Sequence, residues 1–220
     1  MNEPRTVDEL LRAVLGAGRL AIDIGAHVGA KTEGYLALGA QVVCVEPLPE
    51  CVAELRRRFE GNARVVIVPN AAGAMEGRAT MSVCSRAPYL STLSLAWKNG
   101  RFRNEVWDHE IEVPMTTLNA LIEKHGVPDF CKIDVEGYER QVLSALDHRL
   151  PALSIEFARE AVDETALCLD RLAALGCTRF NLAFGQLDTF AFPRWVAARD
   201  VIAMIAGSPD PLAWGDVYAL

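Results

Sequence analysis

The sequence lacks several features that mark particular classes of protein. Its six cysteines form no C-x-x-C pair and its four histidines show no paired spacing, so no zinc-binding pattern is present. Most cysteines lie in apolar runs, which predicts buried free thiols in a reducing compartment. The N-terminus is polar, and no apolar run reaches membrane-spanning length. We therefore expect a cytoplasmic protein with no membrane partner.

Positive charge is scarce. The chain has 22 Lys and Arg against 29 Asp and Glu, a formal net charge of −7. The strongest basic clusters are residues 56–58 and the group Lys98, Arg101 and Arg103, and neither is a long basic block. We therefore expect no nucleic-acid partner. The oligomeric state stays open, and a homodimer is compatible with the sequence.

The chain has no internal repeat, linker or low-complexity tract, and its 220 residues suit one core. We expect one domain over residues 1–220, with an N-terminal helix inside residues 1–18. The apolar pattern then alternates between strand and helix periods, which predicts a three-layer α/β fold with a mostly parallel sheet. Strands are predicted at 20–24, 41–46, 64–68, 129–134, 152–157, 177–184 and 216–220, and helices at 30–38, 49–61, 116–125, 138–146, 161–175 and 199–206.

The middle of the chain departs from this alternation. Residues 78–85 alternate apolar and polar, which predicts an antiparallel strand. Residues 69–73 are expected to be a loop, and residues 111–114 a short strand. Residues 86–110 show no clean period but contain several large aromatic side chains, which is typical of a lid or acceptor-binding loop. We expect Trp97 and Trp107 of this stretch to line an acceptor pocket.

A glycine turn follows the first strand. In the segment Leu-Ala-Ile-Asp-Ile-Gly-Ala-His-Val-Gly at 20–29, Asp23 stands two residues before Gly25. A dinucleotide fingerprint has G-x-G-x-x-G instead, with its acid roughly 20 residues later. A carboxylate at this place repels a pyrophosphate and favours a ligand with positive charge, such as an amino group or a sulfonium. The pattern therefore favours S-adenosylmethionine over NAD, with the backbone of residues 25–29 facing the methionine carboxylate.

Polar residues stand at the ends of five predicted strands, namely Asp23, Glu46, Asn70, Asp134 and Glu156. The ends of parallel strands meet at one edge of a sheet, so these side chains should converge there. Glu46 then suits the ribose hydroxyls, Asn70 the adenine edge, and Asp134 the transferred methyl group. Each residue can instead cap a helix or start a turn, and that alternative stays open for each one alone.

Four segments together resemble the FkbM-type methyltransferase family. They are Asp23-Ile-Gly-Ala-His-Val-Gly29 with Thr32, Val45-Glu46-Pro47, Lys132-Ile-Asp-Val-Glu-Gly137 with Glu139, and Ser154-Ile-Glu156; Ser-Thr-Leu at 91–93 and Leu118 also match. The resemblance covers about residues 20–158, and the family has Asn where this chain has His27. It implies a Rossmann-like class I methyltransferase fold with a seven-stranded sheet whose last strand runs antiparallel. It also implies methyl transfer from S-adenosylmethionine, typically to a hydroxyl of a sugar, polyketide or other secondary metabolite.

Two sets of residues are expected to form the site. The cofactor contacts are predicted to be Asp23, Gly25, Ala26, His27, Gly29, Thr32, Glu46, Pro47, Asn70, Ala71 and Asp134. The catalytic residues are predicted to be Lys132, Asp134, Glu136 and Glu156, with His27 as a further candidate base. Glu136 and Glu139 also stand at a helix start, where the helix dipole favours carboxylates. Lys132 either pairs with a neighbouring acid or contacts the substrate.

Other interpretations remain at this point. Asp134, Glu136 and Glu156 can form an oxygen cluster of the kind that Mg²⁺ or Ca²⁺ uses, although we expect no metal. A nicotinamide-dependent oxidoreductase is a second interpretation, which Asp23 disfavours. A third is a cofactor-binding module without turnover. The group Lys98, Arg101 and Arg103 is either a solvated face or a site for an anionic acceptor. The acceptor itself is expected to be a small molecule or a saccharide.

Overall fold

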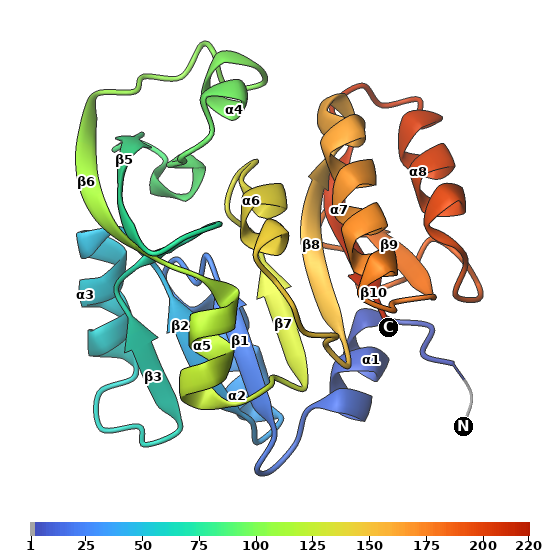
Figure 1. The fold of residues 1–220 in the computed structure, drawn as a ribbon, viewed down its shortest axis with the longest axis horizontal. Coiled ribbons are helices and arrows are strands. Elements are labelled where there is room, and N and C mark those ends of the chain that lie inside the picture. The colour runs from blue at the N-terminus through green and yellow to red at the C-terminus, as the bar shows by residue number, and fades with distance from the viewer. Residues whose placement is uncertain (1–2) are drawn as a thin grey trace.

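The computed structural model describes residues 3–220, which form a seven-stranded sheet covered on both faces by helices (Figure 1). The strand order is β3-β2-β1-β7-β8-β10-β9. β10 runs antiparallel to β8 and β9, and the other pairs are parallel. This confirms the predicted sheet and its antiparallel last strand. The strands are β1 (Leu20–Ile24), β2 (Gln41–Val45), β3 (Val65–Val68), β7 (Phe130–Ile133), β8 (Leu153–Ala158), β9 (Phe180–Phe184) and β10 (Trp214–Ala219).

Two hydrophobic clusters lie on opposite faces of this sheet. One contains the apolar stripes of the helices α5, α6, α7 and α8, and the other contains those of α1, α2 and α3. Neighbouring strand residues alternate between the two clusters, so Ile22 belongs to the first and Ala21 to the second. The helices are α1 (Val7–Val14), α2 (Ala30–Ala37), α3 (Pro49–Arg58), α5 (Leu118–His125), α6 (Glu139–Ser144), α7 (Val162–Ala174) and α8 (Ala198–Ala206).

Local sequence signals fix several helix starts. The hydroxyl of Thr6 accepts a hydrogen bond from the backbone N–H of Glu9 (3.1 Å), as the sequence predicts for the start of α1. Thr117 caps α5 in the same way through the N–H of Ala120 (3.1 Å). Each such cap contributes about 1 kcal/mol. These caps set where α1 and α5 begin, and hence where the neighbouring strands can lie.

A second, three-stranded sheet covers part of the carboxyl edge of the first (Figure 1). It consists of β4 (Ala71–Ala72), β5 (Gly77–Val83) and β6 (His109–Thr116), in the order β4-β6-β5. The antiparallel strand expected at 78–85 is confirmed as β5. The loop expected at 69–73 instead contains β4, and the strand expected at 111–114 extends over all of β6. Both differences arise from pairing with a distant partner, because a strand of two residues has no period of its own.

The stretch at 86–110 is also more ordered than its pattern indicates. It contains the short helices η1 (Pro88–Leu90) and α4 (Leu95–Asn99). Ser94 caps α4 by accepting a hydrogen bond from the N–H of Trp97 (3.2 Å). These helices are too short to show an amphipathic period, which explains why the sequence pattern is irregular here.

Two further features expected from the sequence, the state of the cysteines and the length of apolar segments, can be compared with the structure. All six cysteines are free and buried, as expected of small apolar side chains. Among residues 3–220, no helix has both the length and the apolar character needed to cross a bilayer.

The ends of β2, β1 and β7 are tied together at the glycine turn. The N–H of Gly25 donates to the carbonyl of Val45 (2.9 Å), and the N–H of Asp134 donates to the carbonyl of Ile24 (3.0 Å). Gly25 has a φ of +80°, and a Cβ there would lie 1.7 Å from the carbonyl oxygen of Asp134. Only glycine allows this approach, because any side chain would overlap the backbone of the neighbouring strand.

We predict that Gly25→Ala destabilises the protein strongly. The positive φ alone costs about 1–3 kcal/mol for a residue with a Cβ, and the overlap with Asp134 adds to it. Gly34→Ala is the matched control, because Gly34 lies in helix α2 and a Cβ added there would meet no atom within 4 Å. That variant should gain about 0.5–1 kcal/mol. Urea unfolding measures both, and similar effects of the two changes would contradict the role given to Gly25.

Candidate functional site

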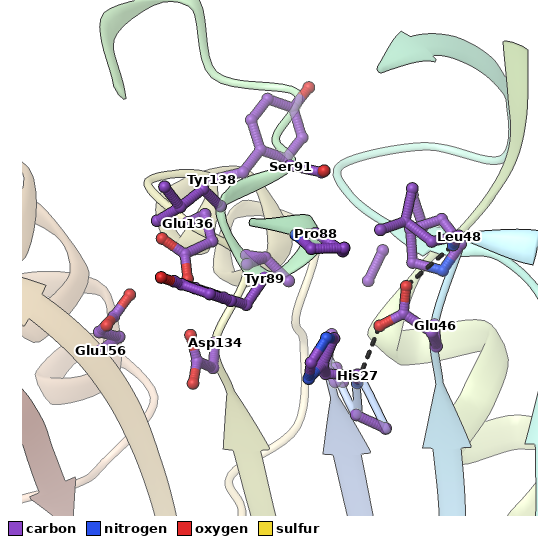
Figure 2. Close-up of a pocket in the computed structure, with 18 of the residues that line it drawn as sticks. His27, Glu46, Leu48, Pro88, Tyr89, Ser91, Asp134, Glu136, Tyr138 and Glu156 are labelled. Carbon is purple, nitrogen blue, oxygen red and sulfur yellow. Dashed lines mark hydrogen bonds between the residues drawn. The ribbon is translucent and has the colours of Figure 1, made fainter. Parts of the chain in front are cut away.

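A cavity of about 640 Å³ lies at the carboxyl ends of β2, β1, β7 and β8 (Figure 2). Four of the five strand-end residues line it, and the exception is Asn70. The other predicted site residues that line it are Gly25, Ala26, His27, Pro47, Ala71, Lys132 and Glu136, whereas Gly29 and Thr32 do not. The carboxylates expected to converge on one crevice therefore do so. Asn70 lies outside the cavity although the next residue along the chain, Ala71, lines it.

Asp23 forms the floor of the cavity at the glycine turn. Its side chain is 1% exposed and accepts a hydrogen bond from the hydroxyl of Thr32 (2.6 Å). Burial raises the pKa of Asp23, and the Thr32 hydroxyl and Lys132 oppose that shift. Thr32 thus acts on the site by orienting Asp23. Gly29 is the N-cap of α2 and has a φ of +84°, so it shapes the turn without facing the cavity.

Glu46 is fixed by two backbone N–H groups at the end of β2. Its Oε2 accepts from His27 (2.9 Å) and its Oε1 from Leu48 (2.8 Å) (Figure 2). Burial raises its pKa to about 7, and these two hydrogen bonds limit the rise. Each carboxylate oxygen of Glu46 can accept a second hydrogen bond, so the pair can accept one from each of two adjacent hydroxyl groups of a ligand. His27 itself has a φ of +48°, a conformation in which both His and Asn are enriched.

Lys132 is buried between two carboxylates. It is 5% exposed, and its Nζ lies 2.6 Å from Oδ2 of Asp134 and 3.5 Å from Oδ1 of Asp216. Burial lowers the pKa of Lys132, but Asp134 and Asp216 outweigh it and hold that pKa well above its ordinary value. Of the two predicted roles, the structure shows pairing with neighbouring acids. The sequence-based prediction did not include Asp216. The one sequence feature that could have indicated Asp216 is that it is a lone acid in the apolar last strand.

Asp134, Glu136 and Glu156 form a cluster at the β7 and β8 end of the cavity (Figure 2). One carboxylate oxygen from each can be chosen so that all three lie within 4.8 Å of one another. Burial raises the pKa of Glu136 and of Glu156 well above the ordinary value, and the charge of Asp134 adds to both shifts. These groups are therefore poised to take up a proton or a positively charged partner.

A comparison with protein families identifies the chain. The model of the methyltransferase FkbM domain matches residues 23–188, which is most of the 220-residue sequence. The chain belongs to the FkbM methyltransferase family. The resemblance seen in the sequence motifs is confirmed, and the matched region contains all the strand-end carboxylates that meet at the cavity.

Solved structures share the fold of this FkbM-family protein. The precorrin-6y C5,15-methyltransferase of Geobacter metallireducens aligns with a TM-score of 0.51 and 12% identity, over 97% of this chain and 87% of that one. SMU.1697c of Streptococcus mutans, in complex with SAH, gives 0.46 and 11% over all of both chains. Fibrillarin of Aeropyrum pernix, with natively bound S-adenosyl-L-methionine, gives 0.44 and 10% over 94% and 68%. No curated protein matches the sequence. The family match and the alignment with the precorrin-6y methyltransferase confirm the predicted class I methyltransferase fold.

Glu139 holds the family's Lys-Ile-Asp-Val-Glu-Gly segment in place. Its Oε1 accepts the backbone N–H groups of Val135 (2.9 Å) and Gly137 (3.3 Å). Between them, Glu136 has a φ of +55°, and its carbonyl accepts a hydrogen bond from the hydroxyl of Thr92 (2.7 Å). Glu139 does not line the cavity. Of these two acids at the helix start, Glu139 thus has a structural role, and Glu136 faces the cavity.

The segment at 86–110 forms one wall of the cavity. Tyr89, Trp97 and Phe102 line it, and the ring of Tyr89 lies edge-on to that of His27 (6.4 Å between centroids). Trp107 does not line it, contrary to expectation, because its Nε1 donates to the carbonyl of Phe102 (3.1 Å).

The basic residues of this segment do not all lie at the cavity. Arg101 lines the cavity and pairs with Glu160 (3.4 Å), whereas Lys98 pairs with Glu110 (3.7 Å) outside it. Leu48, Met81, Gln186 and Trp214 also line the cavity and carried no signal in the sequence.

We predict that Glu139→Gln changes how stability depends on pH. Burial raises the pKa of Glu139 from 4.5 to about 7 in the folded protein. Stability from the neutral carboxyl is therefore complete below about pH 4.5 and is lost as the pH rises through about 7. Gln cannot titrate and keeps an acceptor oxygen for Val135 and Gly137. Relative to the wild type, the variant should gain about 3 kcal/mol between about pH 4 and pH 8.

Urea unfolding at the two pH values measures this difference. Glu123→Gln is the control, since Glu123 is exposed on α5 and makes no side-chain hydrogen bond or ion pair among the described residues. It should follow the wild type at both pH values. Parallel pH profiles for Glu139→Gln and the wild type would contradict the assignment.

Proposed function

We propose that this protein transfers a methyl group from S-adenosylmethionine to a hydroxyl group of a sugar, polyketide or other secondary metabolite. The observation that carries the proposal is that Asp23, Glu46 and Asp134 line one cavity around the glycine turn. Membership of a methyltransferase family supports the reaction class. The cavity of about 640 Å³ is within the range of small-molecule sites.

Each part of the donor has a partner in this chain. Glu46, fixed by His27 and Leu48, accepts the ribose hydroxyls. The free N–H groups at the start of α2 face the methionine carboxylate, and Asp23 supplies negative charge near its cationic groups. For adenine we assign the apolar wall that contains Leu48 and Met81, because Asn70 does not line the cavity.

S-adenosylmethionine supplies an electrophilic methyl group on a sulfonium. The acceptor oxygen forms the new C–O bond as the C–S bond breaks, and the electron pair of that bond remains on sulfur. The hydroxyl proton passes to one carboxylate of the group Asp134, Glu136 and Glu156. Protein groups that align the two reactants and exclude water supply most of the acceleration. The aromatic wall of Tyr89 and Trp97 is suited to both tasks.

A small-molecule or saccharide acceptor fits the charge of the site. Six carboxylates line the cavity against three cationic side chains, so a phosphate backbone would be repelled. The lining acids are Asp23, Glu46, Glu105, Asp134, Glu136 and Glu156, and the lining cations are Lys31, Arg101 and Lys132.

The other two interpretations make different predictions. A nicotinamide-dependent oxidoreductase has no support from the family match, and NADH fluorescence should not respond to the protein. A non-catalytic module would bind S-adenosylmethionine without consuming it. Release of S-adenosylhomocysteine in the presence of a panel of hydroxylated acceptors separates that module from an enzyme.

We predict that Glu46→Ala weakens binding of S-adenosylhomocysteine about 10- to 150-fold. The change removes charged hydrogen bonding to the ribose, which we expect to contribute about 1.5–3 kcal/mol in total. Asp23→Asn should weaken binding less, because it keeps the shape and loses the charge. Calorimetry measures both. Glu50→Ala is the matched control, since Glu50 is exposed on α3 and does not line the cavity.

Thermal unfolding of each variant shows whether it remains folded. Native affinity in a folded Glu46→Ala protein would contradict the place given to the ribose. Failure of the wild type to bind S-adenosylhomocysteine at all would contradict the proposed function.

A further inference from the structure

The acid cluster of Asp134, Glu136 and Glu156 lies on the opposite side of the cavity from Glu46 (Figure 2). Binding the adenosine part of the donor therefore does not use it. Three carboxylates from two strand ends and one loop face a shared space there. This arrangement concentrates negative charge beyond what the donor needs.

Cationic side chains of the protein do not neutralise the cluster. Lys132 contacts Asp134 on one side and Asp216 on the other, so its single charge is shared between two acids. Counting Asp216, four carboxylates surround one ammonium group. Arg101, a second cation that lines the cavity, is paired with Glu160. When all four carboxylates are ionised, they exceed the charge of Lys132 by three among the described residues.

One oxygen of the cluster lacks any partner. Oε2 of Glu156 is closed off from solvent and has no hydrogen bond within the described part of the chain. The residue as a whole is half-buried, and its side chain is directed toward Asp134 and Glu136 (Figure 2). A buried carboxylate oxygen without a partner is costly, because it has lost its water and gained nothing in exchange. Its orientation indicates that a positively charged ligand completes the site.

The fixed conformation of the loop that carries Glu136 also indicates a bound ligand at the cluster. Glu136 is held in a left-handed conformation, and two hydrogen bonds from Val135 and Gly137 to Glu139 fix the loop that carries it. Strained backbone that the surroundings hold in place is common where a ligand is bound. The loop therefore keeps Glu136 beside Asp134 even though the two carboxylates repel each other.

We propose that Asp134, Glu136 and Glu156 bind a divalent cation of the Mg²⁺ or Ca²⁺ class. Their ligand oxygens lie within 4.8 Å of one another. Ca²⁺ at about 2.3–2.6 Å from each ligand spans that separation, and Mg²⁺ at about 2.0–2.1 Å needs a contraction of a few tenths of an ångström. Asp134 has a second oxygen besides the one that contacts Lys132. The proposal reverses the sequence-based expectation of a site without metal.

A divalent ion fits the charge of the cluster better than an amine on the acceptor. The ion leaves an excess of about one negative charge, whereas an ammonium group leaves about two. Carboxylate oxygens are also the ligands that these hard ions prefer. With three protein ligands, the ion keeps positions open toward the cavity. This step rests on the proposed function: we infer that the acceptor binds the ion through two neighbouring oxygens, as a vicinal diol does.

Terbium luminescence tests the ion site without relying on activity. The indole of Trp97 faces Glu136 and is 8% exposed, so it can sensitise Tb³⁺ bound at the cluster. We expect sensitised emission from the full-length protein that excess Ca²⁺ or Mg²⁺ displaces. Glu156→Gln and Glu136→Gln should each weaken Tb³⁺ binding at least tenfold. Glu123→Gln, on exposed α5, should bind Tb³⁺ like the wild type.

Two further measurements on the same variants keep the test decisive. With EDTA present, Glu156→Gln should melt at or above the wild-type temperature, because it removes one of several repelling charges. S-adenosylhomocysteine should bind both Glu→Gln variants with native affinity. Absence of sensitised emission, or equal Tb³⁺ affinity in wild type and both variants, would overturn the ion site. If S-adenosylhomocysteine still binds in that case, only this inference fails and the proposed function stands.

Discussion

The site depends on one steric constraint, the contact between the glycine turn and the end of β7. Gly25 leaves no room for a Cβ beside the carbonyl of Asp134, so the ends of β1 and β7 come together without a side chain between them. Here the chain order reverses: β2 and β3 lie on one side of β1, and β7 and β8 on the other. A crevice forms at such a switch point. Asp23 and Asp134 enter the same space because of it.

Electrostatics then divides the cavity into two ends. At one end, Glu46 is held by two backbone N–H groups, which limit the rise in its pKa caused by burial. At the other end, the cluster of Asp134, Glu136 and Glu156 has Lys132 as its main cation, and Lys132 also serves Asp216 on the distant strand β10. The first end is complete within this chain. The second depends on a partner, whether a proton, an ion or an acceptor.

Local patterns predicted the features that local chemistry controls. The apolar periods located the strands of the main sheet, Thr6 and Thr117 marked helix starts, and strand-end acids such as Glu46 marked the cavity. Features that arise from distant pairing could not be read in this way. Asp216 faces Lys132 only because β10 inserts between β8 and β9, and β4 is a strand only because β6 lies beside it. Asn70 has the right sequence position, but its neighbour Ala71 lines the cavity in its place.

The segment at 86–110 shows why acceptor choice is harder to read than donor binding. The proposed donor contacts come from a turn and strand ends, which the sheet places at fixed positions. Tyr89 and Trp97 instead reach the cavity through contacts with His27 and with the Gly137 loop, neither of which has a sequence pattern. Thr92 ties this segment to the carbonyl of Glu136, so the acceptor wall and the acid cluster are mechanically joined. If this segment contacts the acceptor as proposed, a change in it also acts on the loop that carries Glu136, which a single motif cannot record.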